Sequence, residues 1–176
     1  REGWGRSGDP VESLKLLHEM VNRFHGNVWL LYRLGNKYLA TGFPEIAKLY
    51  FEQILELEPD SGFYFYSMSF YEGAKHNREA AYYYAKKNYE RDTNEVFNEF
   101  LWFCMRAERY DEASIIANKL AKAFLQPGVI VTYFGLHPEI AYCLWRAGDT
   151  IEAKYFFNEA INHWLELIKQ GREEKG

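Results

Sequence analysis

The chain has 176 residues, of which 48% are hydrophobic and 26% are charged, so its length allows one domain, or at most two small ones, with a sizeable core. Its net charge of −4 and its pI near 5.8 lack the basic footprint expected of a nucleic-acid-binding protein. No apolar run approaches the roughly 18 residues that a membrane-spanning helix needs.

The start of the chain and its two cysteines give little information on the cellular compartment. The chain begins with Arg1 and shows no secretory signal peptide, which is consistent with a processed or excised fragment. Cys104 and Cys143 both lie in apolar stretches, and no disulfide framework is present. We therefore expect two free buried thiols, which points weakly to a reducing compartment.

Residues 9–26 form the first expected helix, with Asp9 as its N-cap and Pro10 at its first position. Residues 31–59 then carry a spaced motif. It consists of a large residue, a Leu-Gly pair and a Tyr in "LYRLGNKY" (31–38), followed by Ala47, Phe51 and Pro59. These are the spacings of a 34-residue helix–turn–helix unit.

At this motif the chain resembles the tetratricopeptide repeat family. The resemblance implies an all-α fold, a right-handed α–α superhelix in which antiparallel helix pairs stack as a solenoid. Steps of 33, 33 and 40 residues carry Ala47 to Ala80, Ala113 and Ala153. A small residue is needed at this place because the two helices of a repeat cross closely.

The repeats define the expected organisation. The extra seven residues of the last step fall near Pro127-Gly128, which breaks the helical pattern. We predict a single tetratricopeptide-like domain over residues 1–176. Its parts are a leading helix at 9–26 and four repeats at about 28–60, 61–93, 94–126 and 134–169.

The stretch "GFYFYSMSFYEG" (62–73) holds six aromatic rings in nine positions. The step of 33 makes it the first helix of the second repeat, which is covered on several sides and can therefore be apolar nearly all round. Three residues are expected in packing positions: Tyr64, Met68 and Tyr71. Three more are expected against neighbouring second helices: Phe63, Tyr66 and Phe70.

The resemblance further implies that the first helices line a concave groove that binds a peptide or a partner helix. Trp, Tyr and Arg are enriched at binding hot spots, and exposed apolar patches usually mark interactions. The predicted groove residues are Trp29, Tyr32, Asn36, Phe65, Glu72, Asn98, Trp102, Arg106, Tyr142, Trp145 and Arg146. The alternative is that several of these rings, Phe65 and Tyr142 among them, simply fill the inside of a tightly wound superhelix.

Some members of the family grip a C-terminal carboxylate with a clamp of Lys, Asn, Asn, Lys and Arg. Asn36 matches one clamp position, but the other four positions hold Tyr32, Tyr66, Glu95 and Glu99. One match in five predicts that this chain is not a chaperone-tail clamp. A more apolar or aromatic-anchored ligand is implied.

No catalytic, metal or cofactor site is predicted. The five histidines do not have zinc-site spacing, and His137, which precedes Pro138, is expected to begin a helix. Cys104 and Cys143 fall at or next to a packing position without a base to activate them. The segment 147–153 indicates a helix N-terminus rather than a phosphate loop. An enzyme is therefore not expected.

Two functions remain open. The first is a protein–protein interaction scaffold that binds a peptide or helix in the aromatic groove. The second is a structural subunit or assembly factor of a larger complex, which would use its convex face and ends as permanent interfaces. Aromatic residues that are expected to be exposed support the second function: Tyr82, Tyr83, Tyr89 and Trp164.

In the last helix Tyr155, Phe156, Trp164 and Ile168 cannot all point inward, so we expect this end of the chain to bind another surface. The expected partner is a protein or peptide in both cases.

Overall fold

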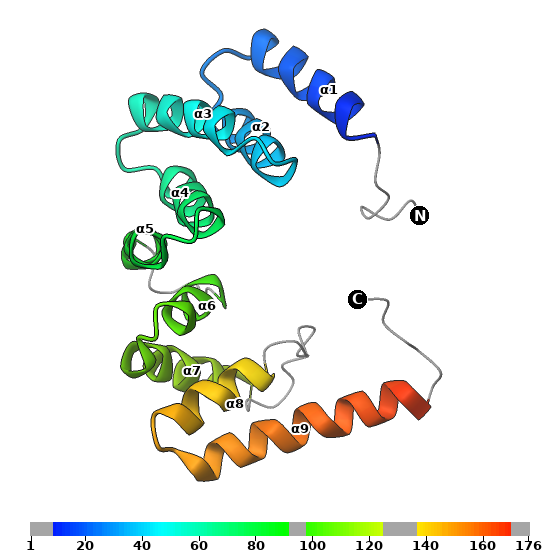
Figure 1. Ribbon diagram of the computed structural model, residues 1–176, viewed down its shortest axis with the longest axis vertical. Helices are drawn as coiled ribbons and strands as arrows, with labels where there is room; N and C mark the ends of the chain where they lie inside the picture. Colours follow the sequence, from blue (N-terminus) through cyan, green and yellow to red (C-terminus); the bar gives the residue numbers. More distant parts are fainter. Residues whose placement is uncertain (1–8, 92–97, 125–136, 170–176) are drawn as a thin grey trace. The chain divides into compact units, whose positions relative to one another are not determined.

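The computed structural model describes residues 9–91, 98–124 and 137–169, and these residues form nine α-helices and no strand (Figure 1). The predicted all-α fold is confirmed. The chain divides into two compact units, Arg1–Asp92 and Thr93–Gly176. A single domain over residues 1–176 stays a prediction. Within the described ranges, no helix combines the length and the apolar character needed to cross a membrane.

The first unit contains one leading helix followed by two helix pairs. Its helices are α1 (Pro10–Arg23), α2 (Val28–Ala40), α3 (Pro44–Leu57), α4 (Gly62–Ala74) and α5 (Arg78–Arg91). The start of α1 follows from Asp9, whose Oδ1 accepts a hydrogen bond of 2.9 Å from the Val11 amide, and from Pro10 in the first turn. In Figure 1, α2 and α3 form one antiparallel pair and α4 and α5 the other, while α4 packs on both α2 and α3.

One hydrophobic cluster joins α2, α3 and α4. Its buried members are Val28, Leu31, Ala47, Phe51, Ile54, Tyr64, Met68 and Tyr71. Gly35 of α2 is buried against the ring of Phe51, and Ala47 is fully buried, so small side chains lie where this helix pair comes closest. Burial, followed by a hydrogen bond with Tyr84, raises the pKa of Tyr64 to about 12, so this phenol stays neutral inside the cluster.

The second unit contains two further helix pairs. Its helices are α6 (Asn98–Arg106), α7 (Tyr110–Phe124), α8 (His137–Arg146) and α9 (Thr150–Lys169). α8 begins at His137, as predicted, and packs on both α7 and α9. Asp149 caps α9 by accepting a hydrogen bond of 3.3 Å from the Glu152 amide. Cys104 and Cys143 are free and buried, which confirms that prediction.

The turns inside the helix pairs give the register of the repeats. Each turn contains one residue with positive φ: Gly42 (87°), His76 (60°), Glu108 (59°) and Gly148 (91°). Left-handed backbone is the usual way to end a helix before a tight turn. These residues lie 34, 32 and 40 positions apart, whereas the sequence steps were 33, 33 and 40. The second repeat is therefore displaced by one residue from the predicted register.

The displacement corrects the small packing residue of the second repeat. Ala81 is buried with 2% of its surface exposed, while Ala80, the predicted residue, is only half-buried. Ala47, Ala113 and Ala153 are buried as predicted. The prediction failed only at α5 because the sequence stretch REAAYYYA has two adjacent alanines, and either fits a helix crossing by size.

The aromatic stretch 62–73 forms α4, and its predicted packing residues Tyr64, Met68 and Tyr71 are buried. Phe65 is half-buried and packs against the hydrophobic cluster of the first unit, as Tyr32 also does, so its place in a groove stays a prediction. With the observed step of 34 residues between the first and second repeats, Phe65 of α4 is equivalent to the buried Leu31 of α2. Phe63 and Tyr66 correspondingly take the places of Trp29 and Tyr32. Both rings contact Tyr32 of α2, a first helix, and their expected position against second helices stays a prediction.

Candidate interaction surface

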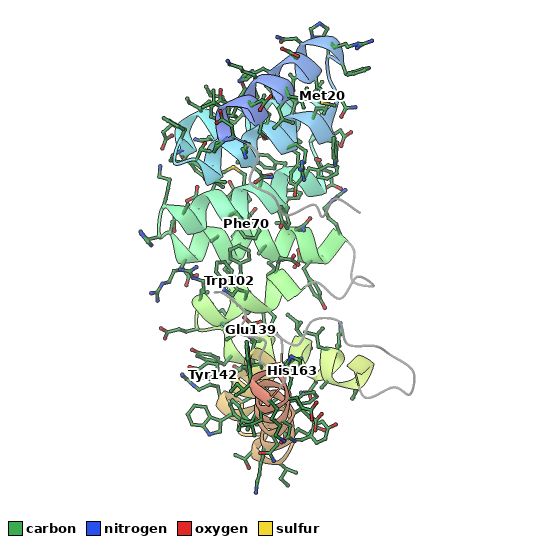
Figure 2. The ribbon with its side chains drawn as sticks, turned by 90° about the vertical axis from the view of Figure 1, so that its right-hand side faces the viewer. Met20, Phe70, Trp102, Glu139, Tyr142 and His163 are labelled. Carbon is green, nitrogen blue, oxygen red and sulfur yellow. The ribbon has the colours of Figure 1, made fainter. Side chains whose placement is uncertain are left out.

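Side chains of the first helices are the candidates for binding. We call them the first-helix face of each unit: α2 and α4 form it in the first unit, and α6 and α8 form it in the second. In the first unit the Tyr32 ring lies between two rings of α4, with centroids 4.9 Å from Phe63 and 6.0 Å from Tyr66. The Tyr66 ring lies 4.9 Å from that of Phe70, which Figure 2 labels. Both helices thus contribute to one aromatic row at distances typical of favourable ring pairs.

Trp29 extends the candidate surface at the start of α2. Its indole is exposed, and Arg33 Cζ lies 5.5 Å from its ring centroid. Such a cation–π contact at an exposed site stabilises by only about 0.5–1 kcal/mol. A partner can therefore meet an aromatic face and a positive charge at the same place without breaking a strong internal contact.

The two polar residues predicted for the groove in this unit have local partners. Asn36 is half-buried, and its Nδ2 donates a 3.0 Å hydrogen bond to the Tyr32 carbonyl oxygen one turn earlier. Glu72 Oε2 accepts a 3.0 Å hydrogen bond from Asn77 Nδ2, and Asn77 Oδ1 in turn accepts from the Ala80 amide at the start of α5. Both residues have a structural contact that explains their presence without a ligand.

In α6 of the second unit, Trp102 and Arg106 form a pair one helical turn apart. Arg106 Cζ lies 4.4 Å from the Trp102 ring centroid, and Trp102 packs edge-on against the buried Phe103 at 4.8 Å. Trp102 is half-buried and Arg106 is exposed. The indole is therefore held on one side while the guanidinium reaches solvent. Asn98, the third residue predicted here, begins α6, and its side chain lies outside the described residues.

The first turn of α7 and the end of α8 build a denser cluster, which we call the Tyr110 cluster. Arg146 Cζ lies 4.0 Å from the Tyr110 ring centroid, and Arg146 Nη1 donates a 3.0 Å hydrogen bond to Tyr142 Oη. The Tyr142 ring lies 6.0 Å from both Tyr110 and Trp145. Trp145 and Arg146 are exposed, so the outer part of the cluster is accessible. Figure 2 labels Tyr142.

Proton affinities within the Tyr110 cluster follow from its hydrogen bonds. A hydrogen bond with Tyr142 raises the pKa of Tyr110. The same bond, followed by the one from Arg146, lowers the pKa of Tyr142 because both favour its phenolate form. The Tyr142 hydroxyl accepts the hydrogen bond of Arg146, which orients the guanidinium.

The structure brings together some predicted residues and adds others. Trp145 and Arg146 join Tyr142 in one cluster, and Arg106 joins Trp102. The sequence reading missed four residues of the surface: Arg33, Phe63, Tyr66 and Tyr110. Arg33 follows Trp29 at the helical spacing of four that also links Trp102 with Arg106 and Tyr142 with Arg146, so this repeated signal was available. Tyr110 lies on a second helix, whereas the repeat motif predicts groove residues on first helices only.

Evidence for catalysis or metal binding is lacking in the part of the chain that the structure describes. No three or more His, Cys, Asp or Glu residues gather there in a way that could hold a metal ion. Burial, followed by the nearby Glu139, raises the pKa of Cys143 to about 12, so this thiol stays protonated and is a poor nucleophile. Burial also raises the pKa of Glu139. The side chain of His137 lies outside the described residues.

The fold is similar to solved structures of helix-repeat proteins. A crystal structure of MamA is 18% identical to the chain with a TM-score of 0.67, and the match covers 92% of each chain. MamA from Desulfovibrio magneticus RS-1 (residues 41 to the end) is 16% identical with a TM-score of 0.66, covering 88% of this chain and 85% of that one. A Podosopora anserina putative kinesin light chain with nearly identical TPR-like repeats is 13% identical with a TM-score of 0.67, covering 93% and 90%.

These likenesses confirm the tetratricopeptide-like fold class that the sequence motif predicted. At such low identities they establish the fold alone. No family model matches the chain, and the comparison with curated proteins gives no match.

Proposed function

We propose that this chain is a protein–protein interaction scaffold that binds a peptide or helix through the first-helix face of each unit. The proposal starts from a tetratricopeptide-like fold, because stacked helix pairs create extended surfaces that such proteins use for binding. It assigns the chain no catalytic activity and no cofactor.

The observation that carries the proposal is the repeated pairing of an aromatic ring with an arginine one turn later. Trp29–Arg33 and Trp102–Arg106 lie in first helices, and Tyr142–Arg146 completes the Tyr110 cluster. Aromatic and arginine side chains are the groups most enriched at binding hot spots. Packing alone does not require the cationic half of each pair, because every one of these arginines is exposed.

The pairs also favour a ligand of particular chemistry. An aromatic ring next to a guanidinium accommodates an apolar side chain and an adjacent carboxylate or carbonyl oxygen. We therefore expect ligands to be peptides that combine large apolar residues with acidic ones. This expectation agrees with the poor match to the family's carboxylate clamp.

The test is a selection of peptides from a random display library on the full chain, followed by affinity measurement for the selected sequence. Tyr32→Ala and Trp102→Ala are each expected to weaken binding by about tenfold or more, as truncation at a hot spot does. Tyr83→Ala is the matched control, because Tyr83 is an exposed aromatic of α5, a second helix.

Circular dichroism checks that each variant keeps its helical content. Equal affinity of the two variants and the control would overturn the proposal. If only Tyr83→Ala weakened the binding of the selected peptides, the binding surface would lie on the second helices instead.

A further inference from the structure

The outer side of α9 carries an apolar stripe that nothing in the described residues explains. Its members lie at spacings of four, seven, eight and eleven along the helix, which puts them on one side. The stripe consists of Phe157, Ile161, Trp164, Leu165 and Ile168, all exposed. The buried residues Ala153, Phe156 and Ala160 lie on the neighbouring side of the helix, which packs on α8.

The same positions are covered on two other second helices of this chain. Phe51 lies four residues after Ala47 of α3 and is fully buried in a cluster with residues of α4. Ala117, four residues after Ala113 of α7, is also fully buried, and α8 packs on α7. Phe157, four residues after Ala153 of α9, is 37% exposed.

The next turn repeats the difference. Leu55 of α3 packs against the cluster, and Ala121 of α7 is 2% exposed, but the corresponding Ile161 of α9 is 55% exposed. On α3 this side packs in the cluster that α3 shares with α2 and α4, and on α7 it is buried in a helix that both α6 and α8 contact. On α9 the same side is apolar, like a helix interface, but no helix packs on it within the described part of the chain.

The length of α9 enlarges the stripe. α9 has 20 residues, compared with 14 in α3 and 15 in α7. By register, α3 ends at the position of His163, so Trp164, Leu165 and Ile168 lie on the extension. A helix of this chain's own repeats would not need these three residues, and leaving them exposed favours non-specific association. The extension therefore points to a binding partner longer than a typical first helix of this chain.

The charges along α9 decide between occupants. Lys154 lies on the stripe one turn before Phe157, and Lys169 follows Ile168 at its other end, while Glu152, Glu159 and Glu166 lie on the opposite side. Two copies of α9 packed in parallel would bring Lys154 against Lys154. Packed antiparallel, they would bring Lys154 towards Lys169. Like charges oppose association in either arrangement, so a second copy of this chain is a poor occupant.

We propose that the α9 stripe binds an amphipathic helix of a partner protein, with an apolar seam flanked by carboxylates. The partner helix takes the place on α9 that α4 has on α3 and that α8 has on α7. Its carboxylates pair with Lys154 and Lys169. This surface lies on a second helix and does not depend on the first-helix face, so either proposal can fail without the other.

The test uses two synthetic helical peptides about three heptads long, with the same leucine seam and with either Glu or Lys at the flanking positions. Their affinities for the full chain are measured by fluorescence anisotropy. The acidic peptide is expected to bind about tenfold or more tightly than the basic one. Ile161→Glu is expected to weaken the binding of the acidic peptide by about tenfold or more. Lys154→Glu is expected to remove most of the difference in affinity between the acidic and the basic peptide.

Glu159→Gln is the matched control, because Glu159 is an exposed residue on the opposite side of α9. It should leave both affinities unchanged. Ile161 is exposed, so glutamate there should be tolerated by the fold, which circular dichroism verifies. The proposal is overturned if neither peptide binds, if the two bind equally, or if sedimentation shows a dimer of the chain that Ile161→Glu converts to monomer.

Discussion

Small residues determine how closely the helices of a pair approach. Gly35 of α2 faces the ring of Phe51 of α3, and a methyl group on Gly35 would meet Phe51 Cε1 and lie 2.8 Å from Cδ1. Real Cβ atoms do not come this close to a ring. The Leu-Gly pair of the sequence motif is therefore a packing requirement in this repeat and has no need of unusual backbone angles.

Gly35→Ala is expected to destabilise the chain by about 1–2 kcal/mol. Overpacking costs about 1–3 kcal/mol, and the better helix propensity of alanine returns up to about 1 kcal/mol. Urea denaturation followed by circular dichroism measures the difference. In combination with Phe51→Leu the loss should be smaller than the sum of the two single losses, because leucine makes room for the methyl group. Strict additivity would contradict the proposed clash.

At the scale of single elements, the helices differ in how firmly they are held. α2 and α3 each bury several side chains, whereas α1 buries none completely. The contacts of α1 include His18, whose Nε2 lies 2.7 Å from Tyr38 Oη and whose ring lies edge-on to Tyr50 at 6.1 Å. Regions with few buried apolar contacts open at lower free energy than the core.

The amides of α1 are therefore expected to exchange with deuterium faster than those of α2 and α3. His18→Ala should accelerate exchange in α1 further, because it removes the hydrogen bond to Tyr38, and should leave α4 unchanged. Leu16→Ala, at an exposed position of the same helix, is the control and should have a smaller effect. Hydrogen–deuterium exchange with mass spectrometry gives both comparisons. Protection of α1 equal to that of α3 would refute the expectation.

The whole chain consists of two compact units, and the buried members of the cluster in the first one all lie within residues 28–71. Repeat proteins gain stability from each repeat and from its contacts with its neighbours. A unit that contains both terms can in principle fold without the rest of the chain.

We expect a fragment of residues 1–92 to fold alone and to unfold cooperatively on heating, as followed by circular dichroism. A fragment of residues 1–60 should lose the cooperative transition, because it lacks Tyr64, Met68 and Tyr71 of the cluster. If the longer fragment showed no cooperative transition, the first unit would depend on the second for its fold.

The sequence predicted the fold class because its signals are local. The Leu-Gly pair, the recurring alanines and the prolines at helix ends report helix pairs and their period, and the packing of such pairs follows from them. Tyr64, Met68 and Tyr71 are also buried as predicted, although the register from which they were predicted is displaced by one residue in this repeat. The candidate surface was predicted in part: Trp29, Tyr32, Trp102, Tyr142, Trp145 and Arg146 belong to the aromatic and cationic groups described above, and their role in binding stays a proposal.

Tertiary structure decided what local pattern could not. In α4, apolar side chains lie on nearly every side, so periodicity does not orient the helix. Only packing on α2 and α3 brings Phe65 against the cluster and puts Phe63 and Tyr66 beside Tyr32. The adjacent Ala80 and Ala81 are equivalent by size, and only the crossing with α4 selects Ala81. The contact of Tyr110 with Arg146 joins two helices across a long stretch of sequence. Local sequence determines which segments form helices, whereas the side each helix buries depends on its neighbours.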